Sequence, residues 1–152
     1  MPNDMTAEAL GQVVITMLQD AAFVFAEPAE SNEREEENVL MARLDFNGPS
    51  SGEMVLSCSR TLAADLAANL LGIEPDDPDA IQRGSDALGE MLNIVGGAVL
   101  ANWFGVDADF EMGVPDVTIL DAGAYRAETA NAKMLLPLET DEGDRIDVAI
   151  LS

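Results

Sequence analysis

The sequence contains no histidine, one cysteine and only 7 lysine and arginine residues against 29 aspartates and glutamates. Without histidine it can form no Ser-His-Asp triad, no Cys-His pair and no histidine-ligated metal site. Cys58 alone cannot form an internal disulfide. The formal charge of −22 repels nucleic acid and anionic membrane surfaces, so neither is expected as a partner. An enzyme of this composition must work with carboxylates, amides or groups that a partner supplies.

The length and the hydrophobic content are those of one folded domain. The chain has 152 residues, 48% of them hydrophobic, which argues against disorder despite the charge. We expect a single domain over residues 1–152. The sequence shows no signal peptide of the usual kind and no apolar run long enough to span a bilayer, so we expect a cytoplasmic protein with no membrane partner. The alternative explanation of the acidity is solvation of the kind found in halophilic proteins.

Changes in hydrophobic period divide the chain into helices and strands. Apolar residues at helical spacing predict three helices, at 5–22, 59–72 and 77–104. Alternating patterns predict strands at 39–46, 53–58, 133–139 and 145–151, with another strand beginning near Gly113 and Pro115. The acidic stretch 27–38 has no apolar period and is predicted to be a solvated loop or connector. This order predicts an α+β fold, a mainly antiparallel sheet with helices packed on one face.

The third predicted helix carries an unusual polar stripe within "SDALGEMLNIVGG". Spacings of four and three residues place Asp86, Glu90, Asn93 and Gly97 on one side of the helix. Apolar side chains gather on the other side: Leu88, Met91, Leu92, Val95, Val99 and Trp103. One side is therefore suited to pack against the domain, and the other to face solvent or a partner.

The spacing Asp86-x-x-x-Glu90-x-x-Asn93, with Pro115 after a gap of 21 residues, resembles the signature of the CheC/CheX/FliY chemotaxis phosphatases. The hairpin and helix in "GPSSGEMVLSCSRTLAADLAANLLG" are similar to those that precede the motif helix in that family. The gap to the proline is slightly shorter than is usual there. The first predicted helix has no Glu-x-x-Asn of its own, so the chain looks like the CheX proteins, which have a single site.

The resemblance implies a function and a set of residue roles. The substrate would be a phosphorylated CheY-type receiver domain, and the enzyme an aspartyl-phosphate phosphatase. Asn93 would orient the attacking water and Glu90 would dock the receiver lysine, while Asp86, Gly96 and Gly97 would contact the partner. Mg²⁺ is expected on the receiver, with no metal site or cofactor on this chain. The resemblance also implies a homodimer joined through its sheet.

Other interpretations of the same residues stay open. A module of the same fold could bind a receiver or a flagellar-switch protein without catalysis, and a purely structural acidic dimerisation module is a third class. Polar residues on the outer stripe of a helix are most often only solvated. Asp86 could serve the helix dipole. Gly96 and Gly97 could allow close packing of the helix on the sheet instead of docking.

Overall fold

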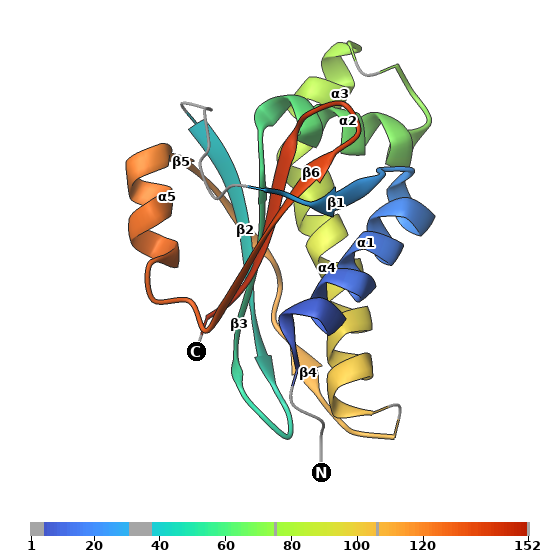
Figure 1. Ribbon diagram of the computed structural model, residues 1–152. Helices are drawn as coiled ribbons and strands as arrows, with labels where there is room; N and C mark the ends of the chain where they lie inside the picture. Colours follow the sequence, from blue (N-terminus) through green and yellow to red (C-terminus); the bar gives the residue numbers. More distant parts are fainter. Residues whose placement is uncertain (1–4, 31–37, 75, 106, 152) are drawn as a thin grey trace.

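The computed structural model describes residues 5–30, 38–74, 76–105 and 107–151 (Figure 1). Its helices are α1 (Ala7–Ala22), α2 (Arg60–Leu71), α3 (Pro78–Gln82), α4 (Gly84–Phe104) and α5 (Ala122–Thr129). Its strands are β1 (Ala26–Pro28), β2 (Asn38–Asn47), β3 (Gly52–Cys58), β4 (Glu111–Met112), β5 (Asp116–Asp121), β6 (Met134–Thr140) and β7 (Arg145–Leu151). Figure 1 shows α1 to α4 on one side of the sheet and α5 on the other.

The described strands form one sheet in the order β1-β6-β7-β3-β2-β4, with β5 also pairing with β2. All pairings between the described strands are antiparallel. The two hairpins predicted from the alternating patterns, β2–β3 and β6–β7, are both present. These pairings confirm the predicted α+β class with a mainly antiparallel sheet.

The main core lies between the sheet and helices α1, α2 and α4. Strands β2 and β3 contribute buried side chains from the face that meets the helices, among them Leu44, Met54 and Leu56. The apolar side of α4 packs against these strands. Its buried residues, all 0% exposed, are Leu88, Met91, Leu92, Val95 and Val99. Burial of this stripe is what fixes the rotation of α4 about its own axis.

Two predicted helices are confirmed and the third is divided. α1 and α2 lie within the predicted ranges. Asp77 caps α3 as its sequence suggests, since its side chain accepts from the Asp79 N–H. The predicted continuous helix from 77 to 104 is wrong, because the chain leaves helical geometry at Arg83 and α4 begins at Gly84. A Cβ on Gly84 would lie 3.1 Å from the Cβ of Ala63, so the break brings this glycine into close contact with α2.

The other face of the sheet carries a helix and a small core that the patterns did not predict. α5 covers Val39, Met41, Val55 and Ala149 with the ring of Tyr125. The Ser57 hydroxyl donates to the Tyr125 hydroxyl (2.7 Å), which donates to Asp147 (2.9 Å). The expectation of helices on one face therefore holds for α1 to α4, and α5 is an addition on the opposite face.

The acidic stretch 27–38 is only partly a connector. β1 takes up residues 26–28 and pairs with the end of β6, and β2 begins at Asn38, so the loop prediction is wrong at both ends. Residues 31–37 of this stretch lie outside the described residues.

α4 is long enough and apolar enough to cross a membrane by length and composition alone. This finding corrects the expectation that no apolar run reaches that length. However, 56% of its most apolar window is buried inside the domain. The hydrophobicity of α4 is explained by its place against the sheet and its neighbouring helices.

Candidate functional site

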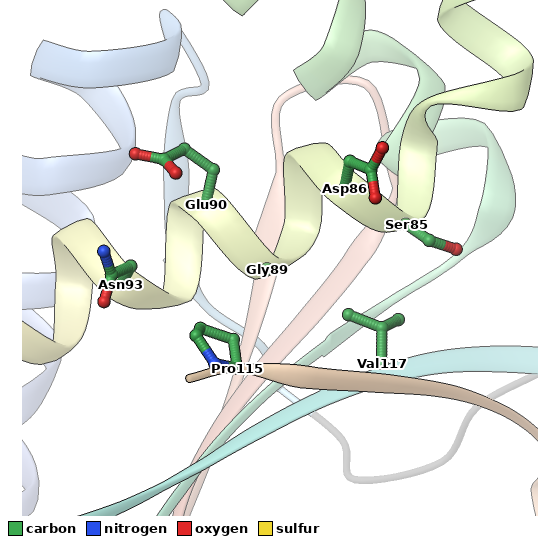
Figure 2. A pocket seen from close by; sticks show the side chains of 7 residues that line it. All are labelled: Ser85, Asp86, Gly89, Glu90, Asn93, Pro115 and Val117. Carbon is green, nitrogen blue, oxygen red and sulfur yellow. The ribbon is translucent and has the colours of Figure 1, made fainter. Parts of the chain in front are cut away.

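The polar stripe of α4 faces outward, as its spacing predicts. Asp86, Glu90 and Asn93 are exposed, whereas Leu92 and Val95 on the opposite side are fully buried. Figure 2 shows the three polar side chains projecting from successive turns of the helix. The helix backbone therefore sets the distances between these groups, and no loop has to be ordered to bring them together.

Pro115 lies beside this stripe although it is distant in sequence. A Cβ placed on Gly89 would be 3.6 Å from the Cβ of Pro115 and 3.5 Å from Cγ2 of Val117. In Figure 2 both of these side chains point from the strand toward the helix. Because Gly89 has no side chain, β5 approaches α4 closely at this point.

Together these residues line one open pocket with a volume of about 360 Å³. Its lining residues are Ser85, Asp86, Gly89, Glu90, Asn93, Pro115 and Val117. The floor is apolar where the strand meets Gly89, and the helix side carries two carboxylates and one amide. This combination can attract a cationic group and can orient a water molecule.

A β-bulge shapes the chain where it approaches the pocket. β4 and β5 pair with the same strand, β2, but their registers differ by one residue. Residues 113–115 lie between them and stand opposite only Leu44 and Asp45, so one residue is extra. The Gly113 N–H donates to the Asp45 carbonyl at 2.7 Å, and Pro115 has no N–H to satisfy. The bulge thus accommodates the proline and directs it toward α4.

The structure brings together four of the residues that the sequence singled out, and leaves two apart. Asp86, Glu90, Asn93 and Pro115 share the pocket, whereas Gly96 and Gly97 do not line it. Gly96 is buried, and a Cβ there would lie 3.3 Å from the sulfur of Met112 and 3.5 Å from Cδ2 of Leu44. This contact favours the packing alternative for Gly96. Gly97 is half-buried beside the same methionine.

Sequence reasoning missed Ser85, Gly89 and Val117, which also line the pocket. Signals in the sequence could have found two of them, Gly89 and Val117. A glycine directly before Glu90 in a helix marks a place where another backbone can come close. Val117 follows Pro115 by two residues, so both side chains fall on the same face of a strand.

A second hollow, of about 370 Å³, gathers a group of carboxylates that the sequence did not reveal. Asp65 on α2 lies with Glu142 and Asp144, from the turn between β6 and β7, with one oxygen of each within 4.8 Å of the others. Burial, and then the charges of Asp144 and Glu142, raise the pKa of Asp65 above its ordinary value of 3.8. These three carboxylates lie close enough together to hold a metal ion, but nothing here shows one, and the expectation that this chain has no metal site stays a prediction.

Comparison of the sequence with family profiles identifies the class of protein. The profile described as "Chemotaxis phosphatase CheX" matches residues 40–139, which include the motif helix and Pro115. The chain belongs to the CheX family. Comparison with curated proteins finds no match.

Solved structures share the fold over nearly the whole chain. A chemotaxis protein CheX from Desulfovibrio desulfuricans is 18% identical with a TM-score of 0.67, and the match covers 95% of this chain and 97% of that one. A putative chemotaxis protein from Desulfovibrio vulgaris Hildenborough is 21% identical with a TM-score of 0.69, and the match covers 99% of this chain and 98% of that one. The CheX of a CheX–CheY–BeF3–Mg²⁺ complex from Borrelia burgdorferi is 16% identical with a TM-score of 0.68, and the match covers 95% of each chain.

Proposed function

We propose that this protein is a phosphatase of a phosphorylated CheY-type receiver domain. The observation that carries the proposal is the pocket in which Glu90, Asn93 and Pro115 meet on the exposed side of α4, in a chain of the CheX family. The CheX–CheY complex from Borrelia burgdorferi supports the choice of partner. A cytoplasmic location, as expected from the sequence, goes with such a partner.

The reaction would be hydrolysis of the receiver's phospho-aspartate by in-line attack of water. As the water oxygen bonds to phosphorus, the bond from phosphorus to the aspartyl oxygen breaks, which leaves the carboxylate and inorganic phosphate. Asn93 acts by accepting a hydrogen bond from this water and holding it in line. A strong base is not required, because the acyl phosphate is itself labile. A hundredfold acceleration amounts to about 3 kcal/mol of barrier, which positioning can supply.

Glu90 has the second role, as the group that aligns the two proteins. It stands nearly one turn before Asn93 on the same exposed stripe, so both side chains can enter one partner site. A carboxylate there pairs with the receiver's lysine through a charge-assisted hydrogen bond. Asp86, one further turn away, adds negative charge at the edge of the pocket. Mg²⁺ belongs to the receiver in this proposal, which is supported by the presence of CheY and Mg²⁺ together in the Borrelia burgdorferi complex.

Phosphate release decides between catalysis and mere binding. A CheY-type receiver is charged with acetyl phosphate, and release of inorganic phosphate is followed with and without this protein. Acceleration at substoichiometric protein supports the phosphatase, and unchanged release together with tight binding supports the non-catalytic alternative.

The homodimer implied by the resemblance also remains a proposal, and the pairing of the strands limits where its sheet edge can be. Val148 lies in β7, which pairs with β6 on one side and β3 on the other, so it offers no free edge. In β6, β1 covers only Leu138 to Thr140, and among the described residues no strand pairs with the outer side of Met134 to Leu136. We place the dimer contact at this edge of β6. Light scattering that reports a monomer across the micromolar range would refute it.

A further inference from the structure

The bulge between β4 and β5 displays one apolar side chain almost completely. Val114 is 90% exposed, more than any other large hydrophobic residue in the described part of the chain. A single exposed valine is ordinary on a protein surface. Its position is what distinguishes it, because it lies within the bulge that forms one side of the pocket.

Contacts on either side place Val114 beside the turn of α4 that carries Asn93. A Cβ on Gly97 would be 3.9 Å from Cε of Met112, and Gly89 makes the contact with Pro115 described above. The bulge therefore runs along α4 between these two glycines. Asn93 lies midway between them in the helix, and Val114 directly precedes Pro115, which lines the pocket.

The backbone around Val114 is held on both sides. Before it, the Gly113 N–H is bonded to the Asp45 carbonyl at 2.7 Å. After it, Pro115 packs toward α4 and restricts the residue that precedes it to extended conformations. An apolar side chain on a fixed backbone loses little conformational entropy when a partner covers it.

Further apolar side chains follow Val114 along the edge strand. Val117 and Ile119 pair with Ala42 and Leu40, which belong to the core on the helix side of the sheet. Directly opposed residues in an antiparallel pair share a face, so Val117 and Ile119 also lie on the helix side. Ile119 is 51% exposed. We name Val114, Pro115, Val117 and Ile119 the apolar strip; it runs beside the polar stripe of α4.

We propose that the apolar strip is a docking surface for the receiver, with Val114 as its anchor, and that it selects receivers with an apolar patch beside the phosphorylation site. The inference rests on the proposed function and adds a determinant of partner choice to it. Polar groups of α4 meet the charged centre of the partner, while the strip meets the apolar surface next to it. Tight interfaces commonly combine such an apolar anchor with charged contacts.

Charge identifies the occupant as a receiver with basic groups rather than a second copy of this chain. Exposed carboxylates lie beside the strip: Asp86 and Glu90 on α4, and Asp121 at the end of β5. A second copy would bring the same carboxylates and a formal charge of −22 to this surface. A partner with a lysine and a bound divalent cation complements the charge instead.

The test measures binding separately from catalysis. CheY-type receivers of the source genome are loaded with BeF3⁻ and Mg²⁺, and the dissociation constant is measured by calorimetry for wild type, Val114→Ser, Val114→Ile and Phe25→Ser. Phe25 is the matched control, since it is 51% exposed and precedes β1 at the opposite end of the sheet order. Phosphate release from the acetyl-phosphate-charged receiver is measured for the same proteins.

We expect Val114→Ser to weaken binding about tenfold, the effect of losing one buried aliphatic contact. Val114→Ile and Phe25→Ser should bind as wild type does. The Michaelis constant for charged receiver should rise with Val114→Ser, with little change in turnover at saturation.

Three outcomes overturn the inference. If wild type and Val114→Ser bind equally well, the strip is not part of the interface, and the proposed phosphatase activity is unaffected. Loss of self-association in Val114→Ser, measured by sedimentation, makes the strip a contact between copies. Failure of wild type to bind any loaded receiver overturns both proposals. If binding depends on Val114 but phosphate release is not accelerated, the proposed phosphatase activity is wrong and the docking surface stands.

Discussion

Two hollows of nearly equal volume, about 360 and 370 Å³, both carry acidic side chains, yet their chemistry differs. In the site pocket the carboxylates of Asp86 and Glu90 follow one helix a turn apart, with the Asn93 amide next in line. In the second hollow three carboxylates from two distant segments crowd within 4.8 Å of one another. Spacing on one rigid helix separates like charges, whereas the meeting of a helix and a turn concentrates them.

The difference shows that neither volume nor the number of acidic groups marks a functional site here. Burial, and then the charges of Asp144 and Glu142, raise the pKa of Asp65, so the second hollow favours a neutral carboxyl over a further charge. The site pocket places the Asn93 amide beside spaced carboxylates and an apolar floor from Pro115 and Val117. The second hollow also contains an amide and apolar side chains, but the side-chain N–H of Asn69 is bonded to the Ala22 carbonyl.

The largest expected effect comes from the amide of the site pocket. Asn93→Ala should lower turnover at saturating charged receiver about a hundredfold and change receiver binding little, because it removes the water contact and leaves Glu90 in place. Stability should change by about 0.5 kcal/mol or less, since the side chain is exposed. Phosphate release and calorimetric binding measure the two effects.

The second hollow supplies a matched control for this substitution. Asn69 lines it, and its side-chain N–H donates to the Ala22 carbonyl at 2.6 Å. Asn69→Ala should cost about 1 kcal/mol of stability through the lost hydrogen bond and leave turnover unchanged. If Asn93→Ala dephosphorylates the receiver as fast as wild type, the catalytic role of Asn93 is wrong and α4 is only a docking surface.

A smaller effect is expected from the carboxylate that aligns the partner. Glu90→Gln should weaken binding of the loaded receiver about tenfold at low salt, because a charged contact becomes a neutral one. The difference from wild type should shrink as ionic strength rises, since salt screens the wild-type contact. Glu142→Gln in the second hollow is the matched control and should leave binding nearly unchanged. A salt-independent loss in Glu90→Gln would argue against pairing with a lysine.

Most of the main sheet and its helices could be predicted from the sequence because their signals are local. Alternation in 39–46 and helical spacing in 85–104 each describe one element buried on one side, and burial of that side is what the structure shows. Glu90 and Asn93 could be predicted for the same reason, because they are polar residues at helical spacing within one largely apolar helix.

The missed features depend on contacts between distant segments. Tyr125, on α5, is buried against the sheet, where its hydroxyl accepts from Ser57 on β3 and donates to Asp147 on β7. β1 is a strand only by pairing with the end of β6. The bulge at 113–115 is visible only in the registers of two pairings. Asp65 and Glu142 are far apart in sequence and come together only when the chain folds, so no local pattern shows the second hollow.

The smallest expected effect tests the crowding in that hollow. The raised pKa means that the folded chain holds a proton on Asp65 more tightly than the unfolded chain does. The contribution of this group to stability is therefore most favourable below its ordinary pKa of 3.8 and is lost as pH rises through the folded-state value. Asp65→Asn should remove the penalty and stabilise the folded chain at neutral pH by about 0.5 kcal/mol or less, because the group is partly solvated. Urea unfolding at several pH values measures it.

A double-mutant cycle identifies the source of this gain. Glu142→Gln removes one of the two neighbouring charges that raise the pKa of Asp65. In that background the benefit of Asp65→Asn should be smaller, since less repulsion is left to relieve. Phosphate release should be unchanged in all three variants, because the hollow lies apart from the residues that line the site pocket. An additive cycle would mean that burial of Asp65, the first cause of its raised pKa, accounts for the penalty without a measurable share from Glu142. A lower stability of Asp65→Asn at neutral pH would mean that the carboxylate makes a favourable contact that outweighs the crowding.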